Sequence, residues 1–432
     1  MNMLDIITKK RDGLELTTEE IQYFIRSYVY GEIPDYQAAA LLMAIYFQML
    51  TRKETFALTE AMEYSGDVED LSPIPGIKID KHSTGGVGDK TTLIVGPIAA
   101  AAGVTVAKMS GRGLGFTGGT ADKLEAIPGF QTTLTPEAFQ KQLEKIGLAV
   151  ITQSGSMTPA DKKLYALRDV TGTVENPGLI ASSIMSKKLA SGSDGIVLDV
   201  KCGNGAFLKD EEAATELAEL MMDIGKNAGK RMVAVISDMN QPLGQAVGNT
   251  LEVEEAIQVL QGKGPEDVRN LCLQLAAEMI YLGECAESPE AAYALAESKL
   301  NSGAALQKFL EMVEMQGGDA HILEGNLTDL NEAYIVASNQ AGYVASVDTE
   351  AIGHISQHLG AGRLRKEDPI DPSAGIELMV QIGDAVQPGD MLGILYTRKD
   401  EFIPEAEARL RKAIHLADNP VAPPQLIKKI IR

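Results

Sequence analysis

The stretch IKIDKHSTGGVGDKTTLIVGPIAAAAGVTVAKMSGRGLGFTGGTADKLE, from Ile77 to Glu125, contains one pattern twice: a short apolar run, a glycine-rich loop and a helix-compatible segment. The apolar runs at Ile77 to Ile79 and Val104 to Ala107 have the length and the bounding turns of buried strands in a parallel sheet. Ligands of open α/β sheets bind at the carboxyl ends of such strands. We therefore expect the two glycine loops to converge at one edge of one sheet.

Both loops contain groups that bind an anion the size of phosphate. Glycine lets backbone N–H groups approach a ligand closely, and the start of a helix adds partial positive charge and unpaired donors. A tight strand-to-helix turn also needs glycine, but two turns that each hold lysine and hydroxyl groups favour a ligand site. The candidate phosphate-binding residues are Lys81, Ser83 and Thr92 in the first loop and Lys108, Ser110 and Thr120 in the second.

The glycine loops do not match the common nucleotide-binding motifs. The segment GGVGDKT is similar to a Walker loop, but Asp89 stands where the glycine before the lysine belongs. A carboxylate there would face triphosphate oxygens. The segment GRGLGFTGGT also lacks the spacing of a dinucleotide-binding loop that is followed by a ribose-binding acid.

Composition narrows the range of partners. The chain has 432 residues, of which 45% are apolar and 23% charged, and its formal net charge of -21 argues against nucleic acid and anionic membranes as partners. Three cysteines without metal or redox spacing indicate a reducing compartment, so we expect a cytoplasmic protein. The N-terminal MNMLDIITKKRDG lacks the apolar core of a signal peptide, and no membrane role is expected.

Helical and sheet-forming segments alternate along the chain. Thr17 with Glu20 forms a capping box at the start of an amphipathic helix, and a first helical region ends near Gly66. Its apolar stripes are typical of either a core or a dimer interface, and we expect the dimer interface. Segments rich in proline, glycine and serine at 67–76 and 153–163 are candidate hinges. The expected domains are an α-helical one of residues 1–66, an α/β one of residues 75–157 and 193–335, and a C-terminal α+β one of residues 340–432.

A second polar group is expected on two helices that follow the second hinge. Tyr165 and Arg168 lie on one, and Ser183 and Lys187 lie one turn apart on the next. An amphipathic surface would have the same spacing, but cations and a hydroxyl on neighbouring helices could also read the polar edge of a planar base. His82, within the first anion loop, could donate or accept a proton near neutral pH, although a single loop histidine is often structural.

At these residues the sequence resembles the thymidine and pyrimidine-nucleoside phosphorylases. The resemblance implies α/β with a separate α-helical domain, a nucleoside phosphorylase/phosphoribosyltransferase-type fold, plus a C-terminal α+β hammerhead-like module. It also implies that residues of about 158–192 join the N-terminal helical domain, residues 1–66, in space. That module resembles biotinyl and lipoyl carriers around IGDAVQPGDML but has no modifiable lysine at the hairpin tip. The matching segments are KHSTGGVGDK, SGRGLGFTGGTADKLE, YALRD, SSIMSKK, DVK-x-G-x-GAF and SDMNQPLG.

The resemblance implies reversible phosphorolysis of uridine, deoxyuridine and thymidine to free base and a (deoxy)ribose 1-phosphate. Inorganic phosphate would bind to the α/β domain and the pyrimidine to Tyr165, Arg168, Ser183 and Lys187, and closure at the hinges would bring the reactants together. His82 would act as the acid that assists departure of the base. Neither an organic cofactor nor a catalytic metal is required, and the resemblance also implies a homodimer formed through the helical domain.

Five positions depart from, or distinguish, members of this family. Lys108 stands where thymidine-specific relatives have an apolar residue, which predicts use of ribonucleosides as well. Phe116 replaces a histidine, and Cys202 and Asn204 alter a third glycine loop. The resemblance also implies a structural potassium ion, for which Lys90 replaces Thr or Val, so that its carbonyl alone could serve and its ammonium would weaken the site. The implied ligands are Gly88, Lys90, Leu243, Ala246 and Glu255.

Two competing functions are weighed against phosphorolysis. An anthranilate phosphoribosyltransferase would need acidic ligands for Mg²⁺ and pyrophosphate, which the glycine loops do not provide. A non-catalytic nucleoside sensor would keep Arg168, Ser183 and Lys187 but would not need His82 and the lysines of the phosphate loops. The presence of both sets therefore favours the enzyme.

Overall fold

The computed structural model describes residues 1–113, 115–152, 156–323, 327, 332–365 and 368–432. The contacts divide the chain into two compact units. Residues 1–75, 153–196 and 216–232 form one, here called the helical unit, and residues 76–152, 197–215 and 233–432 form the other, the sheet unit. The first three residues of the second expected hinge, 153–155, lie outside the described residues.

The helical unit is built from amphipathic helices with one common core. Its N-terminal helices and those of the 159–190 segment bury their apolar faces together, with Phe24, Leu41, Leu164 and Leu179 in one cluster. The predicted capping box is confirmed, because the Glu20 side chain accepts from Thr17 N at 2.7 Å while the Thr17 hydroxyl accepts from Glu20 N at 3.3 Å. The helices are α1 (Met3–Arg11), α2 (Thr18–Val29), α3 (Asp35–Gln48), α4 (Arg52–Glu63), α8 (Pro159–Asp169) and α9 (Pro177–Ala190).

The central sheet of the sheet unit has the strand order β1-β4-β5-β13. Every residue of β4 is buried, as expected of a strand covered on both faces. The neighbouring β2 and β3 pair in parallel, and β2 is joined to β1 by a parallel bridge between Lys78 and Thr105. The strands are β1 (Ile79–Ser83), β2 (Val106–Ser110), β3 (Leu148–Thr152), β4 (Gly195–Cys202), β5 (Arg231–Asp238) and β13 (Ile427–Ile431).

Helices follow these strands and enclose the main apolar core. In α7, Thr135 caps the first turn, Pro136 occupies the first helical position and Gly147 ends the helix with φ 69°, a left-handed conformation that favours glycine. The core contains Ile94, Leu148 and Leu275, all fully buried. The helices are α5 (Thr91–Ala101), α6 (Thr120–Leu124), α7 (Pro136–Ile146), α11 (Asn249–Leu260), α12 (Glu266–Leu282), α13 (Pro289–Asn301) and α14 (Ala304–Met315). One more helix, α10 (Glu211–Asn227), begins in the sheet unit and belongs to the helical unit from residue 216 on.

The C-terminal part of the sheet unit forms two small antiparallel sheets around its own apolar cluster, which contains Val344, Ile376 and Leu410. It matches the expected α+β module. One sheet has the order β10-β8-β12 and the other β6-β9-β11-β7. Their elements are β6 (Ala246–Val247), β7 (Ala333–Ala337), β8 (Gly342–Val347), α15 (Thr349–Ser356), β9 (Gly375–Leu378), β10 (Ala385–Val386), β11 (Met391–Tyr396), α16 (Ile403–Ala413) and β12 (Ile414–Ala417).

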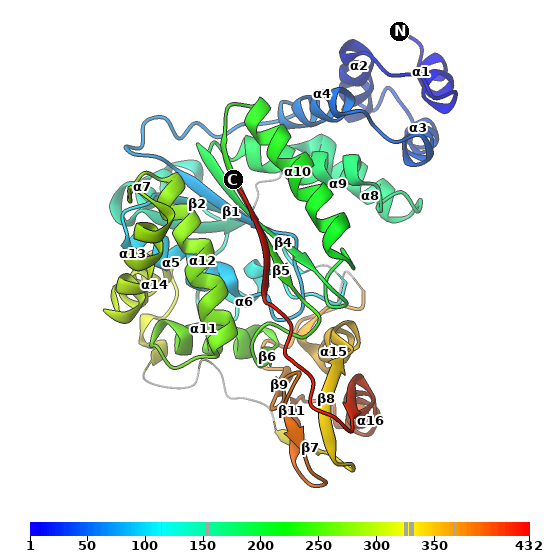
Figure 1. Cartoon of the computed structure of the whole chain (residues 1–432). Helices are drawn as coiled ribbons and strands as arrows, with labels where there is room; N and C mark the ends of the chain where they lie inside the picture. The colour runs from blue at the N-terminus through cyan, green and yellow to red at the C-terminus, as the bar shows by residue number, and fades with distance from the viewer. Residues whose placement is uncertain (114, 153–155, 324–326, 328–331, 366–367) are drawn as a thin grey trace. The chain divides into compact units, whose positions relative to one another are not determined.

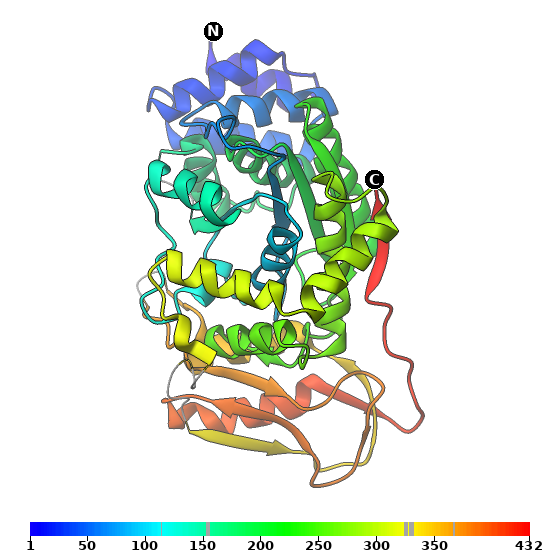
Figure 2. The same ribbon diagram turned by 90° about the vertical axis from the view of Figure 1, so that its left-hand side faces the viewer.

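The final strand departs from the expectation that residues 340–432 remain in one C-terminal domain. After β12 the chain returns to the central sheet, where β13 pairs antiparallel with β5, as both views show (Figures 1 and 2). Arg432 then pairs with the buried Glu278 of α12 at 2.6 Å. The three isoleucines of β13 favour a strand, and an antiparallel edge position needs no crossover helix.

No helix among the described residues is both long enough and apolar enough to cross a membrane.

Candidate active site

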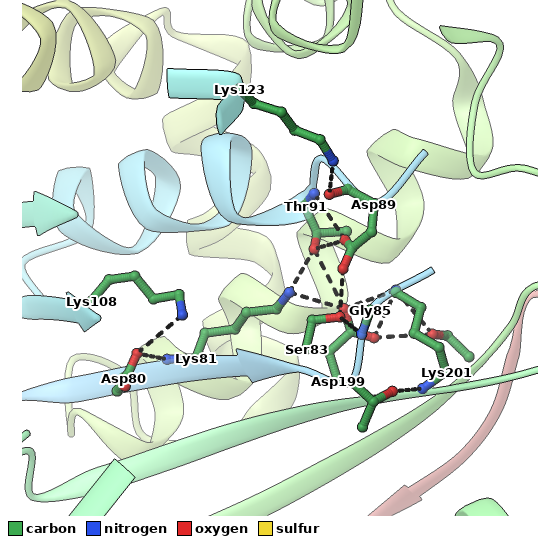
Figure 3. Close-up of polar contacts among 12 residues, drawn as sticks. Asp80, Lys81, Ser83, Gly85, Asp89, Thr91, Lys108, Lys123, Asp199 and Lys201 are labelled. Atoms are coloured by element: carbon green, nitrogen blue, oxygen red, sulfur yellow. Dashed lines mark hydrogen bonds and ion pairs between the residues drawn. The ribbon is translucent and has the colours of Figure 1, made fainter. Parts of the chain in front are cut away.

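Lys81 lies at the centre of the polar network that follows β1. Its side chain is 2% exposed, and its ammonium donates to the Thr91 hydroxyl at 2.6 Å and pairs with Asp199 of β4 at 3.0 Å (Figure 3). The predicted Thr92 is the next residue of α5 and is also buried. The lysine is thus held in one place by neighbours from β4 and α5.

Asp89 is the residue that distinguishes the first glycine loop from a Walker loop. It stabilises this glycine loop through hydrogen bonds. Its carboxylate accepts from the Ser83 hydroxyl and from the Thr91 hydroxyl, while its backbone carbonyl accepts from Lys123 at 2.8 Å (Figure 3). Burial acts to raise the pKa of Asp89, but Lys81, Lys201 and Lys123 hold that pKa well below its usual range. The aspartate is therefore an anion that orients the loop.

Lys108 is the central residue of β2 and is 4% exposed. Its ammonium donates to the carbonyl of Met109 at 2.8 Å and lies 4.0 Å from Asp80 Oδ1. The same oxygen accepts from the backbone N–H of Lys81 at 2.7 Å. Asp80 therefore joins the two predicted phosphate lysines at the start of both loops (Figure 3).

The second glycine loop differs from the expected strand-loop-helix pattern. Its helix, α6, spans only Thr120–Leu124, and Pro128 follows soon afterwards. The loop therefore lacks the electrostatic contribution of a long helix. Asp122 of α6 instead accepts from Gly113 N at 2.7 Å and pairs with Arg112 and Arg363. Ser110 and Thr120, both partly buried, lie at the two ends of this loop.

His82 is partly buried on β1 between Lys81 and Ser83. Successive residues of a strand point to opposite faces, so its imidazole lies on the face opposite to that of its two neighbours. Its role as an acid toward the base stays a prediction.

Several functional candidates were not identified from the sequence as site residues. Asp199 and Lys201 are fully buried on β4 and pair at 2.8 Å, and Ser237 of β5 donates to Asp199 at 3.0 Å. The signal that could have found them is a charged pair inside the apolar run IVLDVK, because an unpaired charge is rarely buried. Thr84 connects the first glycine loop to β4, since its hydroxyl accepts a hydrogen bond from Lys201 N at 2.9 Å.

In the helical unit, Arg168 is directed largely toward backbone carbonyls. Its guanidinium donates to the carbonyls of Thr173, Val174 and Leu179 at 3.1, 2.7 and 3.1 Å. Burial lowers the pKa of Arg168 from its usual value. A guanidinium has five N–H groups, so this arrangement fixes its plane and leaves two for a ligand.

Ser183 and Lys187 do lie together, as their spacing predicts. Lys187 donates to the Ser183 hydroxyl at 3.1 Å and forms an ion pair with Asp161 of α8. The other carboxylate oxygen of Asp161 is buried and accepts no hydrogen bond from the described residues. Tyr165 is partly buried on the same helix, where burial and Asp169 raise its pKa. Asp161 is a further candidate site residue that was not identified from the sequence.

The implied potassium ligands lie together in the sheet unit, but they do not fit a metal ion. The Lys90 side chain reaches the carbonyls of Leu243 and Ala246 at 2.8 and 2.9 Å and donates to Glu255 as well. Gly88 contributes its carbonyl to Lys90 N at 2.9 Å. The oxygens that would coordinate the ion therefore already accept hydrogen bonds from Lys90.

The other departures from the family pattern are accommodated by packing. Phe116 lies 5.8 Å from the ring of Phe207 and 5.2 Å from that of His354, measured between ring centroids. Asn204 donates to the carbonyl of Val347 at 2.9 Å and accepts from Thr349 N at 2.6 Å. The second and third glycine loops thus contact the C-terminal module through an aromatic cluster and an amide.

Three family models match separate parts of the sequence. The helical bundle domain of a glycosyl transferase family matches residues 4–66, and the a/b domain of that family matches residues 76–306. The pyrimidine nucleoside phosphorylase C-terminal domain matches residues 343–417.

Curated relatives match along the whole chain, whereas a solved structure matches in fold alone. The anthranilate phosphoribosyltransferase of Thermus thermophilus is 21% identical with a TM-score of 0.59, over 72% of this chain and 99% of that one. The pyrimidine-nucleoside phosphorylase of Geobacillus stearothermophilus is 51% identical over 99% of both chains. That of Staphylococcus aureus strain USA300 is 53% identical over 100% of both. The chain therefore belongs to the pyrimidine-nucleoside phosphorylase family of glycosyl transferases.

Proposed function

We propose that this protein catalyses reversible phosphorolysis of pyrimidine nucleosides to free base and pentose 1-phosphate. The observation that supports this most strongly is the pair of buried lysines on β1 and β2 together with the hydroxyl groups of the two glycine loops. It occurs in a chain that matches relatives named pyrimidine-nucleoside phosphorylase over its full length. Uridine, deoxyuridine and thymidine are the proposed substrates.

Inorganic phosphate is the proposed nucleophile. Lys81 and Lys108 supply positive charge, and Ser83, Thr92, Ser110 and Thr120 supply hydroxyl groups. Asp80, Asp89 and Asp199 fix the lysines and the loops, so the site needs little rearrangement when phosphate binds. A phosphate oxygen attacks the anomeric carbon from the face opposite the base, the C–N bond breaks, and its electron pair leaves with the pyrimidine.

Departure of the base requires stabilisation of negative charge on its ring. Lys187 and Ser183, held by Asp161, and the two remaining N–H groups of Arg168 are the proposed donors to the polar edge of the pyrimidine. His82 is the proposed acid that protonates the departing base. Since the step is a single displacement without oxidation or reduction, no organic cofactor takes part.

We also propose that the protein is a cytoplasmic homodimer that associates through the helical unit. The dimer is supported by large apolar side chains on the surface of α3, where Tyr36 is 75% and Phe47 is 74% exposed. Replacement of both by serine should shift the mass measured by light scattering from dimer to monomer. A dimeric mass for the double variant would contradict this interface.

The proposed reaction is tested by ultraviolet detection of uracil and thymine released from their nucleosides, with and without inorganic phosphate. Release from uridine, deoxyuridine and thymidine only when phosphate is present is the expected result. Release without phosphate would indicate a hydrolase. Binding of nucleosides without release under any condition would indicate a sensor.

A further inference from the structure

We infer that the Lys90 ammonium takes the place of the monovalent cation that the family resemblance implies. This protein would then carry the cation as part of its own chain and fold without potassium. The Lys90 site is structural and takes no part in the proposed reaction.

The number of donors on Lys90 matches the number of acceptors around it. An ammonium has three N–H groups, and here they donate to Leu243 O, Ala246 O and a carboxylate oxygen of Glu255. These backbone carbonyls and this carboxylate are the hard oxygen ligands that would bind potassium. One lysine therefore uses three of the oxygens on which a metal site would depend.

The other groups around the implied ion site also already make close contacts within the protein. The second oxygen of Glu255 accepts from the backbone N–H groups of Gln245 and Ala246 at 2.9 and 3.2 Å. Gly88 lies so close to the backbone of Leu243 that a Cβ on Gly88 would be 2.8 Å from Leu243 O. The pocket around the ammonium is thus closed by the same loop that precedes α5.

Charge balance leads to the same conclusion. Lys90 is fully buried and Glu255 is 5% exposed, so the carboxylate needs a cation beside it. The nearby Glu252 has its own partner, Lys123, at 2.6 Å. The Lys90 ammonium forms an ion pair with Glu255 and supplies that cation. A potassium ion would add an unbalanced positive charge.

The consequence is a permanent tie between two distant segments. Lys90 joins the first glycine loop, just before α5, to the segment from Leu243 to Ala246 that leads into α11. A metal ion would make the same connection only at sufficient concentration, because its contribution depends on mass action. The covalent ammonium makes this connection independent of the ionic composition of the solution.

The experiment compares apparent melting temperatures in potassium chloride and in tetramethylammonium chloride of equal ionic strength. Tetramethylammonium is too large to enter such a site and cannot donate hydrogen bonds. The wild-type protein should melt at the same temperature in both salts. In crystals soaked with a thallous salt, a heavy mimic of potassium, no anomalous peak should appear beside Glu255.

The variant Lys90→Thr removes the ammonium and leaves the oxygens. It should melt several degrees lower than wild type in tetramethylammonium, and potassium should restore the loss in a saturable manner. In Lys90→Thr/Glu255→Gln, the control without the buried carboxylate, potassium should restore much less. Lys123→Met removes a lysine of equal burial, and the resulting decrease in melting temperature should not respond to potassium.

Two results would overturn the inference: a saturable rise of the wild-type melting temperature with potassium, or a thallous peak beside Glu255 in wild-type crystals. A Lys90→Thr variant that folds but melts at the same temperature in both salts would also count against it. If that variant does not fold in either salt, the two wild-type measurements decide.

Discussion

At the level of single residues, buried carboxylates hold the cations of both polar groups in place. Asp199 pairs with Lys81 in the sheet unit, and Asp161 pairs with Lys187 in the helical unit. Breaking a buried pair leaves an uncompensated charge, so each carboxylate holds its lysine in position. Substitutions at this scale should therefore alter binding of one reactant at a time.

Asp161→Asn should weaken nucleoside binding. The change removes the charge that orients Lys187 but keeps the shape of the side chain, and hydrogen bonds to charged groups contribute about 1.5–3 kcal/mol. Steady-state kinetics should show KM for uridine raised by about tenfold or more, with KM for phosphate nearly unchanged.

A rise in both KM values by the same factor would mean that Asp161 acts through the general stability of the protein. Lys187→Met and the double variant complete a cycle, in which the two changes should be less than additive because they remove one interaction.

Lys108→Met should reduce use of uridine more than use of thymidine. A long donor at this position can reach a ribose 2-hydroxyl, which thymidine lacks, whereas methionine has a similar length without a donor. The ratio of kcat/KM for the two nucleosides measures the effect, and thymidine is the internal control. Equal losses for both substrates would contradict the specificity argument.

At the level of elements, the sequence identified strands and loops better than it identified their long-range partners. The glycine loops do follow β1 and β2, and the Thr17 capping box has the expected bonds, because both depend on neighbours within a few residues. The pairing of Asp122 with Arg363 and the direction of the Lys90 side chain depend on residues more than a hundred positions away. Local patterns contain no information about such contacts.

The helix α4 provides an element-scale prediction at Glu63. Its side chain is 8% exposed, and burial raises its pKa to about 7, against the opposing effect of Lys230. A carboxyl group whose pKa is higher in the folded state favours folding at low pH. That contribution is lost as the pH rises from the usual glutamate value, about 4.5, to about 7.

Glu63→Gln should therefore melt at a higher temperature than wild type at pH 8 and at nearly the same temperature at pH 5. The gain at pH 8 is on the order of 2 kcal/mol, because one unit of pKa corresponds to about 1.4 kcal/mol and partial solvation reduces the effect. Calorimetric melting at both values of pH measures it. An equal shift at both would show that packing, and not ionisation, is responsible.

At the level of the whole molecule, the chain ends by returning to its central sheet. The pairing of β13 with β5 covers a sheet edge, and Arg432 neutralises the buried Glu278. Composition and motifs predicted the α/β, helical and C-terminal α+β parts, but the return of β13 joins segments separated by almost two hundred residues. No pattern within the strand itself specifies that partner.

Removal of residues 427–432 should lower the apparent melting temperature by several degrees and increase aggregation, because the edge of β5 becomes available to other chains. Light scattering during heating measures both effects. Arg432→Gln, which removes the ion pair and keeps the strand, should show a smaller loss without aggregation. If the truncated protein behaves like Arg432→Gln, the strand pairing contributes little.

Inorganic phosphate, and not water, is the proposed nucleophile that displaces the pyrimidine. Phosphorus NMR of a reaction with uridine follows phosphate and sugar phosphate in one sample, while absorbance gives uracil. We predict that each uracil released is accompanied by one α-ribose 1-phosphate and the loss of one inorganic phosphate, since attack opposite the base inverts the anomeric carbon. Release of uracil with unchanged phosphate and free ribose would contradict the account.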